Sequence, residues 1–132
     1  MASILVVDDE LSMREFLTIL LEKEGYGVRA AADGKSALAL LEAQPFDLVI
    51  SDIRMPGMTG LELLARSKQL RPETGVIMIT AFASPDDAVT AMKNGAFDYI
   101  TKPFNVDEIR SVVRAAMKKR PTLESWYSAP DS

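Results

Sequence analysis

Residues 47–64, DLVISDIRMPGMTGLELL, combine the features that decide the fold of this chain. A continuous apolar run at 48–50 precedes Ser51 and Asp52, and a Pro-Gly turn at 56–57 leads into an amphipathic segment. Short apolar runs without alternating polar residues are typical of strands that are covered on both faces of a parallel sheet. The stretch therefore predicts a buried strand, a tight turn and a helix.

Similar strand signals lie on both sides of this stretch. Two further continuous apolar runs occur at 4–7 and 76–79, and weaker strand candidates occur at 28–31 and 97–100. Strands in the centre of a parallel sheet are the more continuously apolar ones. We therefore expect three central strands and two edge strands.

The segment after the first apolar run has the period of a helix. A Ser-Met-Arg-Glu capping box at 12–15 predicts its start, and Gly25 predicts its end. Its expected buried stripe consists of Met13, Phe16, Leu17, Leu20 and Leu21.

Four more helices follow the other strand candidates. The second and third are expected at 35–43 and 61–70. Ser84 and Asn105 have side chains that favour N-cap positions, so they predict the starts of a fourth and a fifth helix.

Five strand–helix units in succession predict a single α/β domain. The strong and weak strands fit a doubly wound, five-stranded parallel sheet of order 2-1-3-4-5, as in flavodoxin-like folds. We expect this domain to span 1–120. Residues 121–132 lack periodicity and core content, which predicts a flexible tail or the start of a linker.

Composition excludes several classes of function. The chain of 132 residues has no cysteine and no histidine, which removes disulfide frameworks, thiol catalysis, Ser-His-Asp hydrolysis and His-ligated zinc. Its formal net charge of −4 argues against direct binding of nucleic acid or of an anionic membrane. No apolar run approaches the roughly 20 residues of a membrane helix, so a cytoplasmic location is expected.

Polar side chains follow four of the predicted strands. Asp8 and Asp9 follow the first strand, Asp52 the third, Thr80 the fourth and Lys102 the fifth. Ligands of open α/β sheets bind beyond the carboxyl ends of the strands. Taken alone, each aspartate could be a solvated or capping acid of a turn. Thr80 alone could be a strand-end hydroxyl that satisfies backbone groups, and Lys102 alone a surface lysine. Their joint occurrence predicts one site.

The predicted site requires a cation. Three carboxylates in one pocket repel each other, and a hard dication with oxygen ligands, Mg²⁺, would offset them. Together with one lysine, such a site is neutral and suits an anionic phosphoryl group.

Four motifs carry a family resemblance: LVVDDE at 5–10, the stretch at 47–64, ITAFAS at 79–84 and DYITKPF at 98–104. In this order and spacing they resemble the receiver domain of two-component response regulators over 3–119. They are most similar to the amino-terminal receivers of enhancer-binding transcription activators of the nitrogen-regulation and dicarboxylate-transport type.

The resemblance implies a phosphoryl acceptor and a metal site. Asp52 would take a phosphoryl group from the phosphohistidine of a sensor histidine kinase, and slow autodephosphorylation would follow. Asp9 would bind Mg²⁺ directly, Asp8 mostly through water, and Asp52 and the backbone carbonyl of Arg54 would complete the ligands.

The resemblance also assigns the surrounding residues. Lys102 would pair with the phosphoryl oxygens and Thr80 would hydrogen-bond them. Tyr99 occupies the switch position and would turn inward on phosphorylation, altering the face formed by the fourth helix, fifth strand and fifth helix. Its alternative is an edge-strand tyrosine with a solvated hydroxyl. The bond before Pro103 would be cis.

Two positions depart from common receiver choices. Arg54 and Phe82 flank the path of an attacking water, so a shielding role predicts slow loss of the phosphoryl group. The alternative is that both side chains point into solvent.

The output of such receivers lies outside this sequence. The resemblance implies a homodimer and, in a longer parent protein, an ATPase and a DNA-binding domain. The sequence contains neither a Walker loop nor a helix-turn-helix, so the chain is an excised receiver or a stand-alone one.

Two other classes share parts of this pattern. A dehalogenase-type phosphatase needs a second Asp two residues after the nucleophile, where this chain has Arg54. A flavodoxin-like flavin carrier needs a phosphate-binding loop after the first strand, where this chain has three acids at 8–10.

Overall fold

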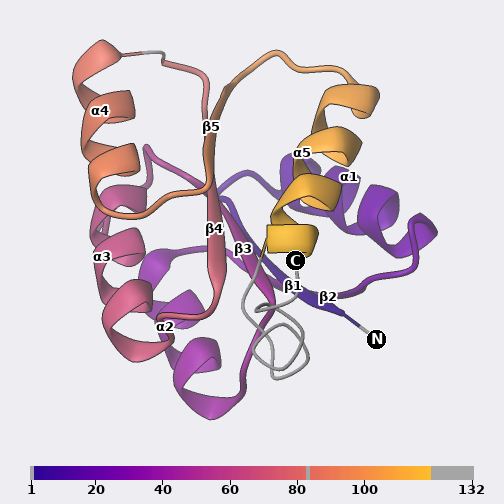
Figure 1. Cartoon of the computed structure of the whole chain (residues 1–132), viewed down its shortest axis with the longest axis horizontal. Coiled ribbons are helices and arrows are strands. Elements are labelled where there is room, and N and C mark those ends of the chain that lie inside the picture. Colours follow the sequence, from indigo (N-terminus) through magenta and orange to yellow (C-terminus); the bar gives the residue numbers. More distant parts are fainter. Residues whose placement is uncertain (1, 83, 120–132) are drawn as a thin grey trace, which may run out of the picture.

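The computed structural model describes residues 2–82 and 84–119 and contains one parallel sheet (Figure 1). The strands are β1 (Ser3–Val7), β2 (Gly27–Ala31), β3 (Leu48–Asp52), β4 (Gly75–Thr80) and β5 (Asp98–Thr101). Their order is β2-β1-β3-β4-β5. The predicted sheet and its two edge strands are therefore confirmed.

Helices cover both faces of the sheet (Figure 1). They are α1 (Leu11–Lys23), α2 (Gly34–Ala43), α3 (Gly60–Leu70), α4 (Pro85–Lys93) and α5 (Val106–Lys119). In Figure 1, α2, α3 and α4 lie on one side of the sheet, and α1 and α5 lie on the other. This arrangement is the doubly wound one.

The core consists of two apolar layers that the sheet separates. Leu63 and Leu64 of α3 belong to the layer under α2, α3 and α4. Leu17 of α1 and Ile109 of α5 belong to the other layer. All five residues of β3 are buried, because this strand is covered on both faces. The continuous apolar runs of the sequence are the strands that contact both layers.

The strand register aligns the ends of the strands. Val7 pairs with Ser51, Asp52 with Ile79, and Thr80 with Thr101. The residues that follow β1, β3, β4 and β5 therefore meet at one edge of the sheet.

The predicted start of α1 was wrong. The helix begins at Leu11, and its N-cap residue, Glu10, makes no side-chain cap hydrogen bond. Ser12 already lies in the first turn, so it cannot cap. The structure instead has a capping box at Thr59 and Glu62, which begins α3.

The predicted apolar stripe of α1 was too wide. Leu17, Leu20 and Leu21 are buried, whereas Phe16 is 41% exposed. The ring of Phe16 lies 6.3 Å from the ring of Phe104, between centroids. Phe16 therefore packs against the β5–α5 loop at the surface instead of entering the core.

The other two cap predictions are confirmed. The Ser84 hydroxyl accepts a hydrogen bond from the backbone N–H of Asp87 at 3.3 Å. The Asn105 side chain accepts one from Glu108 at 2.7 Å. Each satisfies a backbone donor that the first turn of its helix leaves free.

Within the described residues, no helix is long and apolar enough to cross a membrane. The tail predicted at 121–132 lies outside the described part of the chain.

Candidate functional site

Three carboxylates gather at the carboxyl edge of the sheet. One oxygen from each of Asp8, Asp9 and Asp52 lies within 4.8 Å of the others. Asp8 and Asp52 are buried, at 2% and 8% exposure, and Asp9 is exposed. The cluster forms because β1 and β3 are neighbours in the sheet.

Lys102 reaches this cluster from the end of β5. Its Nζ lies 3.1 Å from Asp8 Oδ2 and 3.4 Å from Asp52 Oδ2. Its backbone N–H donates to the carbonyl of Thr80 at 2.7 Å, which ties the β5–α5 loop to β4. The Lys102–Pro103 peptide bond is cis, the isomer that the resemblance implies.

Burial and neighbouring charges shift the pKa of both partners. Burial raises the pKa of Asp52, while the backbone N–H of Arg54 and the charge of Lys102 oppose this rise. Burial alone would lower the pKa of Lys102, but the carboxylates of Asp52 and Asp8 outweigh it and raise that pKa. The lysine is therefore a cation at neutral pH.

Thr80 is fully buried at the end of β4. Its Oγ1 accepts a hydrogen bond from the backbone N–H of Phe82 at 3.1 Å. The hydroxyl therefore holds the loop that leads from β4 to α4. The side chain of Phe82 itself is 66% exposed.

Tyr99 connects β5 to the start of α4. It is half-buried and packs against the apolar layer under α2, α3 and α4. Its hydroxyl accepts a hydrogen bond from the backbone N–H of Ser84, the N-cap residue of α4, at 3.3 Å. The hydroxyl thus has a protein partner.

Arg54 contacts two parts of the molecule. Its backbone N–H donates to Asp52 Oδ1 at 3.1 Å. Its guanidinium, on a side chain that is 55% exposed, forms an ion pair with Asp87 of α4 at 3.0 Å. No sequence signal indicates a role for Asp87, because the two residues are 33 positions apart and only the fold brings them together.

Arg14 also contacts the site without a sequence signal for it. Its Nη1 donates to the backbone carbonyl of Asp8 at 2.7 Å. The Asp8 side chain in turn accepts from the backbone N–H of Glu10 at 2.9 Å. These bonds position the β1–α1 loop. An arginine on the polar face of an amphipathic helix gives no sequence signal for such a role.

The acidic cluster fits Mg²⁺ chemically. Mg²⁺ prefers oxygen ligands and keeps several waters, so it needs only a few protein oxygens. The three carboxylate oxygens lie close enough together to share one ion. The chain has neither histidine nor cysteine, which softer metals prefer.

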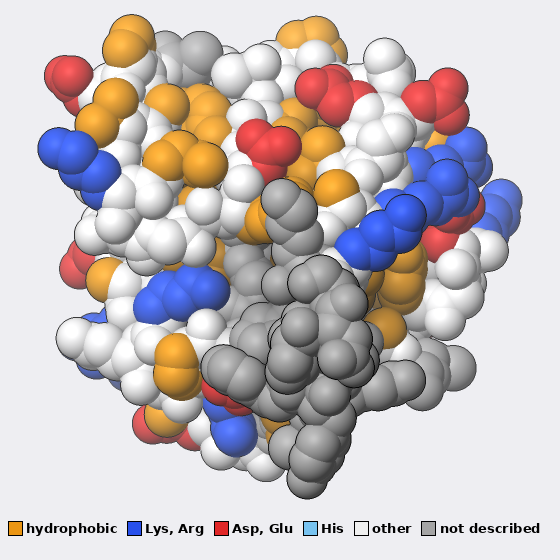
Figure 2. Space-filling view, viewed as in Figure 1, with side chains coloured by type: hydrophobic (Ala, Val, Ile, Leu, Met, Phe, Trp, Pro, Cys, Tyr) orange, Lys and Arg blue, Asp and Glu red, His pale blue; other side chains and the backbone are white. Residues whose placement is uncertain are grey.

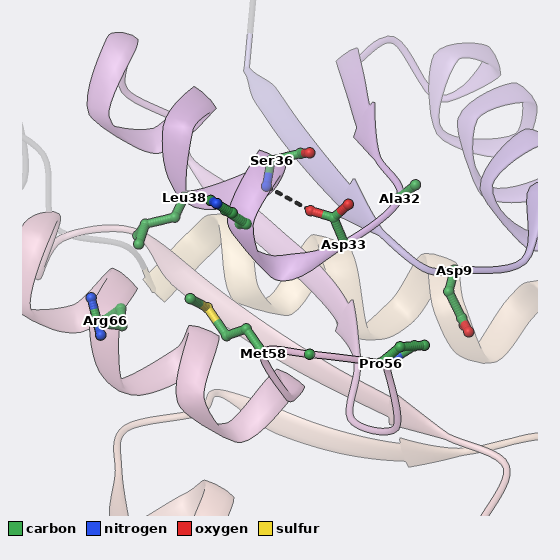
Figure 3. A pocket seen from close by; sticks show the side chains of 10 residues that line it. Asp9, Ala32, Asp33, Ser36, Leu38, Pro56, Met58 and Arg66 are labelled. Atoms are coloured by element: carbon green, nitrogen blue, oxygen red, sulfur yellow. Dashed lines mark hydrogen bonds between the residues drawn. The ribbon is translucent and has the colours of Figure 1, made fainter.

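A groove of about 910 Å³ opens beside Asp9. Figure 3 shows it between α2, α3 and the loop that carries Pro56 and Met58. Within it, the Asp33 carboxylate accepts a hydrogen bond from the backbone N–H of Ser36 at 2.7 Å. Asp9 of the acidic cluster lines the groove, whereas Asp52 and Lys102 do not.

A model of the response regulator receiver domain matches residues 4–114. The chain belongs to this family. The receiver domain is 43% identical to response regulator protein PilR of Pseudomonas aeruginosa over 116 residues, which cover 88% of this chain and 26% of PilR. It is 38% identical to transcriptional regulatory protein ZraR of Escherichia coli over 122 residues, covering 92% and 28%.

Solved receiver structures have the same fold. A CheY-like receiver domain protein from Methanospirillum hungatei is 35% identical, with a TM-score of 0.88 over 90% of this chain and 95% of its own. A beryllofluoride-activated NtrC4 receiver domain dimer is 34% identical, with a TM-score of 0.86 over 90% and 98%.

The receiver spans only about a quarter of the length of PilR and ZraR. It is a receiver domain with a phospho-accepting signalling role.

Proposed function

We propose that Asp52 accepts the phosphoryl group, in a reaction that depends on Mg²⁺. The observation that carries this proposal is the joint approach of Asp8, Asp9 and Lys102 to Asp52. Asp52 ends the central strand β3, between β1, which Asp8 and Asp9 follow, and β4, which Thr80 ends. It therefore has the acids that would hold a metal on one side and a hydroxyl on the other.

The transfer is a substitution at phosphorus. A carboxylate oxygen of Asp52 attacks the phosphorus of a phosphohistidine on a sensor histidine kinase. The new O–P bond forms as the N–P bond breaks, and the imidazole nitrogen takes the electron pair and then a proton. Such transfers need positioning and charge neutralisation more than a strong base. The chain therefore needs no histidine of its own.

The cations of the site balance the charge of the incoming group. Asp8, Asp9, Asp52 and the carbonyl of Arg54 would hold Mg²⁺, with Asp8 acting mostly through water. The bound ion would supply charge neutralisation and orientation. Lys102, already within 3.4 Å of Asp52, pairs with a phosphoryl oxygen.

A phosphoryl group on Asp52 also offers Thr80 a new partner. Its hydroxyl, which donates to the carbonyl of Phe82 at 3.5 Å, would then donate to a phosphoryl oxygen instead, and this exchange shifts the β4–α4 loop. Tyr99 follows, because its own hydroxyl is bonded to the residue that caps α4. We assign to Tyr99 the switch that alters the α4–β5–α5 face.

Arg54 and Phe82 tune the lifetime of the acyl phosphate. Both flank the route of an attacking water, although Phe82 is largely exposed here. Phe82→Ser is expected to speed autodephosphorylation severalfold, measured as loss of phosphorylated mass after the phosphodonor is removed. An unchanged rate would refute the shielding role.

The altered α4–β5–α5 face transmits the signal to an output. ZraR is named a transcriptional regulatory protein and PilR a response regulator protein, which supports an output in transcription. If the receiver is excised from a longer cytoplasmic protein, an ATPase and a DNA-binding domain of that protein would carry the output. The net charge of −4 of the whole chain argues against direct binding of nucleic acid or of an anionic membrane.

We infer that activation promotes a homodimer through α4. Val89, Met92 and Phe82 are 53%, 49% and 66% exposed. Figure 2 shows hydrophobic side chains gathered over the part of the surface where α4 lies. Exposed apolar clusters of this kind mark protein interfaces.

Phosphorylation from a small donor tests the proposed function. The protein is incubated with Mg²⁺ and acetyl phosphate, and its intact mass is recorded. We expect the mass of one phosphoryl group, and none for Asp52→Asn or after Mg²⁺ is chelated. Asp47→Asn is the matched control, because it removes an acid of the same type outside the pocket. No added mass on the unaltered protein would overturn the proposal.

A further inference from the structure

One ion pair connects the loop after Asp52 to α4. Arg54 Nη2 lies 3.0 Å from Asp87 Oδ2, in a hydrogen-bonded geometry. The Asp87 side chain is only 22% exposed, whereas that of Arg54 is 55% exposed. The carboxylate is thus the fixed partner, and the guanidinium is the one with room to move.

Both residues of this pair are anchored by backbone bonds. The N–H of Arg54 donates to the carboxylate of Asp52 at 3.1 Å. The N–H of Asp87 donates to Ser84, whose own N–H donates to the hydroxyl of Tyr99 at 3.3 Å. A continuous set of contacts therefore runs from the acceptor carboxylate to α4 and the tyrosine of β5.

We propose that the guanidinium of Arg54 is shared between Asp87 and the phosphoryl group on Asp52. In the unphosphorylated protein it holds the first turn of α4, and phosphorylation draws it away and frees that turn. This inference rests on the proposed function, since it needs Asp52 to be the acceptor. Asp87 then competes with the phosphoryl group for the guanidinium of Arg54.

The charges favour this exchange. The phosphoryl group carries about −1.5 to −2 charges on three acceptor oxygens, against one charge on the carboxylate of Asp87. Guanidinium groups bind phosphate oxygens in a planar, two-point geometry. An ion pair whose arginine is half exposed contributes little, so its loss costs little. Asp87 should therefore act as a weak brake on phosphorylation.

Two acids of the same helix turn provide a matched test. Asp86 and Asp87 both lie in the first turn of α4, where the helix dipole stabilises a negative charge. Asp86 is exposed and makes no ion pair with the part of the chain that the structure describes. Asp86→Asn and Asp87→Asn thus remove the same charge and differ in the contact with Arg54.

The protein is titrated with beryllofluoride in the presence of Mg²⁺, and the hydrogen exchange of the α4 amides is followed. The concentration of beryllofluoride that gives half of the full change is the quantity compared between variants. We expect Asp87→Asn to lower the half-saturating concentration about threefold, the range of one exposed ion pair. It should also speed amide exchange in the first turn of α4 before beryllofluoride is added. Asp86→Asn should do neither.

A second background isolates the role of Arg54. In the Arg54→Ala protein, Asp87→Asn should add no further change to either readout. Equal behaviour of Asp87→Asn and Asp86→Asn would overturn the inference, as would a full effect of Asp87→Asn without Arg54. Failure of the unaltered protein to gain mass from acetyl phosphate would instead overturn the proposed function, and this inference with it.

Discussion

At the scale of single residues, Asp52 is a carboxylate in a place that disfavours its charge. Burial raises its pKa above the ordinary value of 3.8. The unfolded chain therefore releases this proton at lower pH than the folded one. Ionised Asp52 therefore lowers the free energy of unfolding. This effect is fully present above the raised pKa of the folded state and is lost as the pH falls to the ordinary pKa of the unfolded chain.

This shift predicts that Asp52→Asn stabilises the fold. In Mg²⁺-free buffer at neutral pH the gain should be about 1 kcal/mol, the usual scale of a single substitution. It should shrink as pH falls from the raised pKa toward 3.8. Urea unfolding at several pH values measures it, with exposed Asp86→Asn as control. A variant less stable than the parent at neutral pH would contradict this account.

The gathering of the acids and Lys102 could be predicted because each of them lies within two residues of the end of a strand signal. Strand ends can be located from composition, and parallel strands bring their ends to one edge. The contacts of Arg14 and Asp87 could not be predicted. Both are helix-surface residues, and their partners depend on how α1 and α4 pack against the sheet.

At the scale of elements, the capping of helices shows why a motif alone can mislead. Ser12 and Thr59 each stand three residues before a Glu. Only Thr59 precedes its helix, and its hydroxyl accepts from the backbone N–H of Glu62 at 3.2 Å. Ser12 lies inside α1, because the chain turns into that helix directly after β1 and its acids.

This difference predicts unequal effects of two similar substitutions. Thr59→Ala should lower the free energy of unfolding by about 1 kcal/mol, because it leaves a backbone donor of α3 unsatisfied. Ser12→Ala should change it little or raise it slightly, since alanine is the better helix former. Equal losses in urea unfolding would show that the assignment of the caps is wrong.

At the scale of the whole molecule, the order of the sheet followed from the strength of each apolar run. The apolar runs did not predict which apolar residues remain at the surface. Phe16 has the spacing of a buried residue, yet it lies outside the core. Val89 and Met92 on α4 likewise have helical spacing without burial. A periodic pattern indicates a face, and packing decides how much of that face is covered.

The exposed residues of α4 predict where the receiver associates. Met92→Asp should abolish the dimer that beryllofluoride and Mg²⁺ induce, because it places a charge in an apolar contact. Sedimentation velocity with and without beryllofluoride measures it. Ile19→Asp is the control, since Ile19 is 56% exposed on α1, on the other side of the sheet. Loss of the dimer only in Ile19→Asp would move the interface to α1.

The central claim is that, of the three clustered acids, Asp52 alone receives the phosphoryl group. Borohydride reduces an acyl phosphate of aspartate to homoserine, which peptide mass spectrometry locates. After treatment with Mg²⁺ and acetyl phosphate, we expect homoserine at position 52 and unchanged aspartate at positions 8 and 9. Homoserine at position 8 or 9, or a phosphoryl group that resists borohydride on a hydroxyl such as that of Thr80, would contradict it.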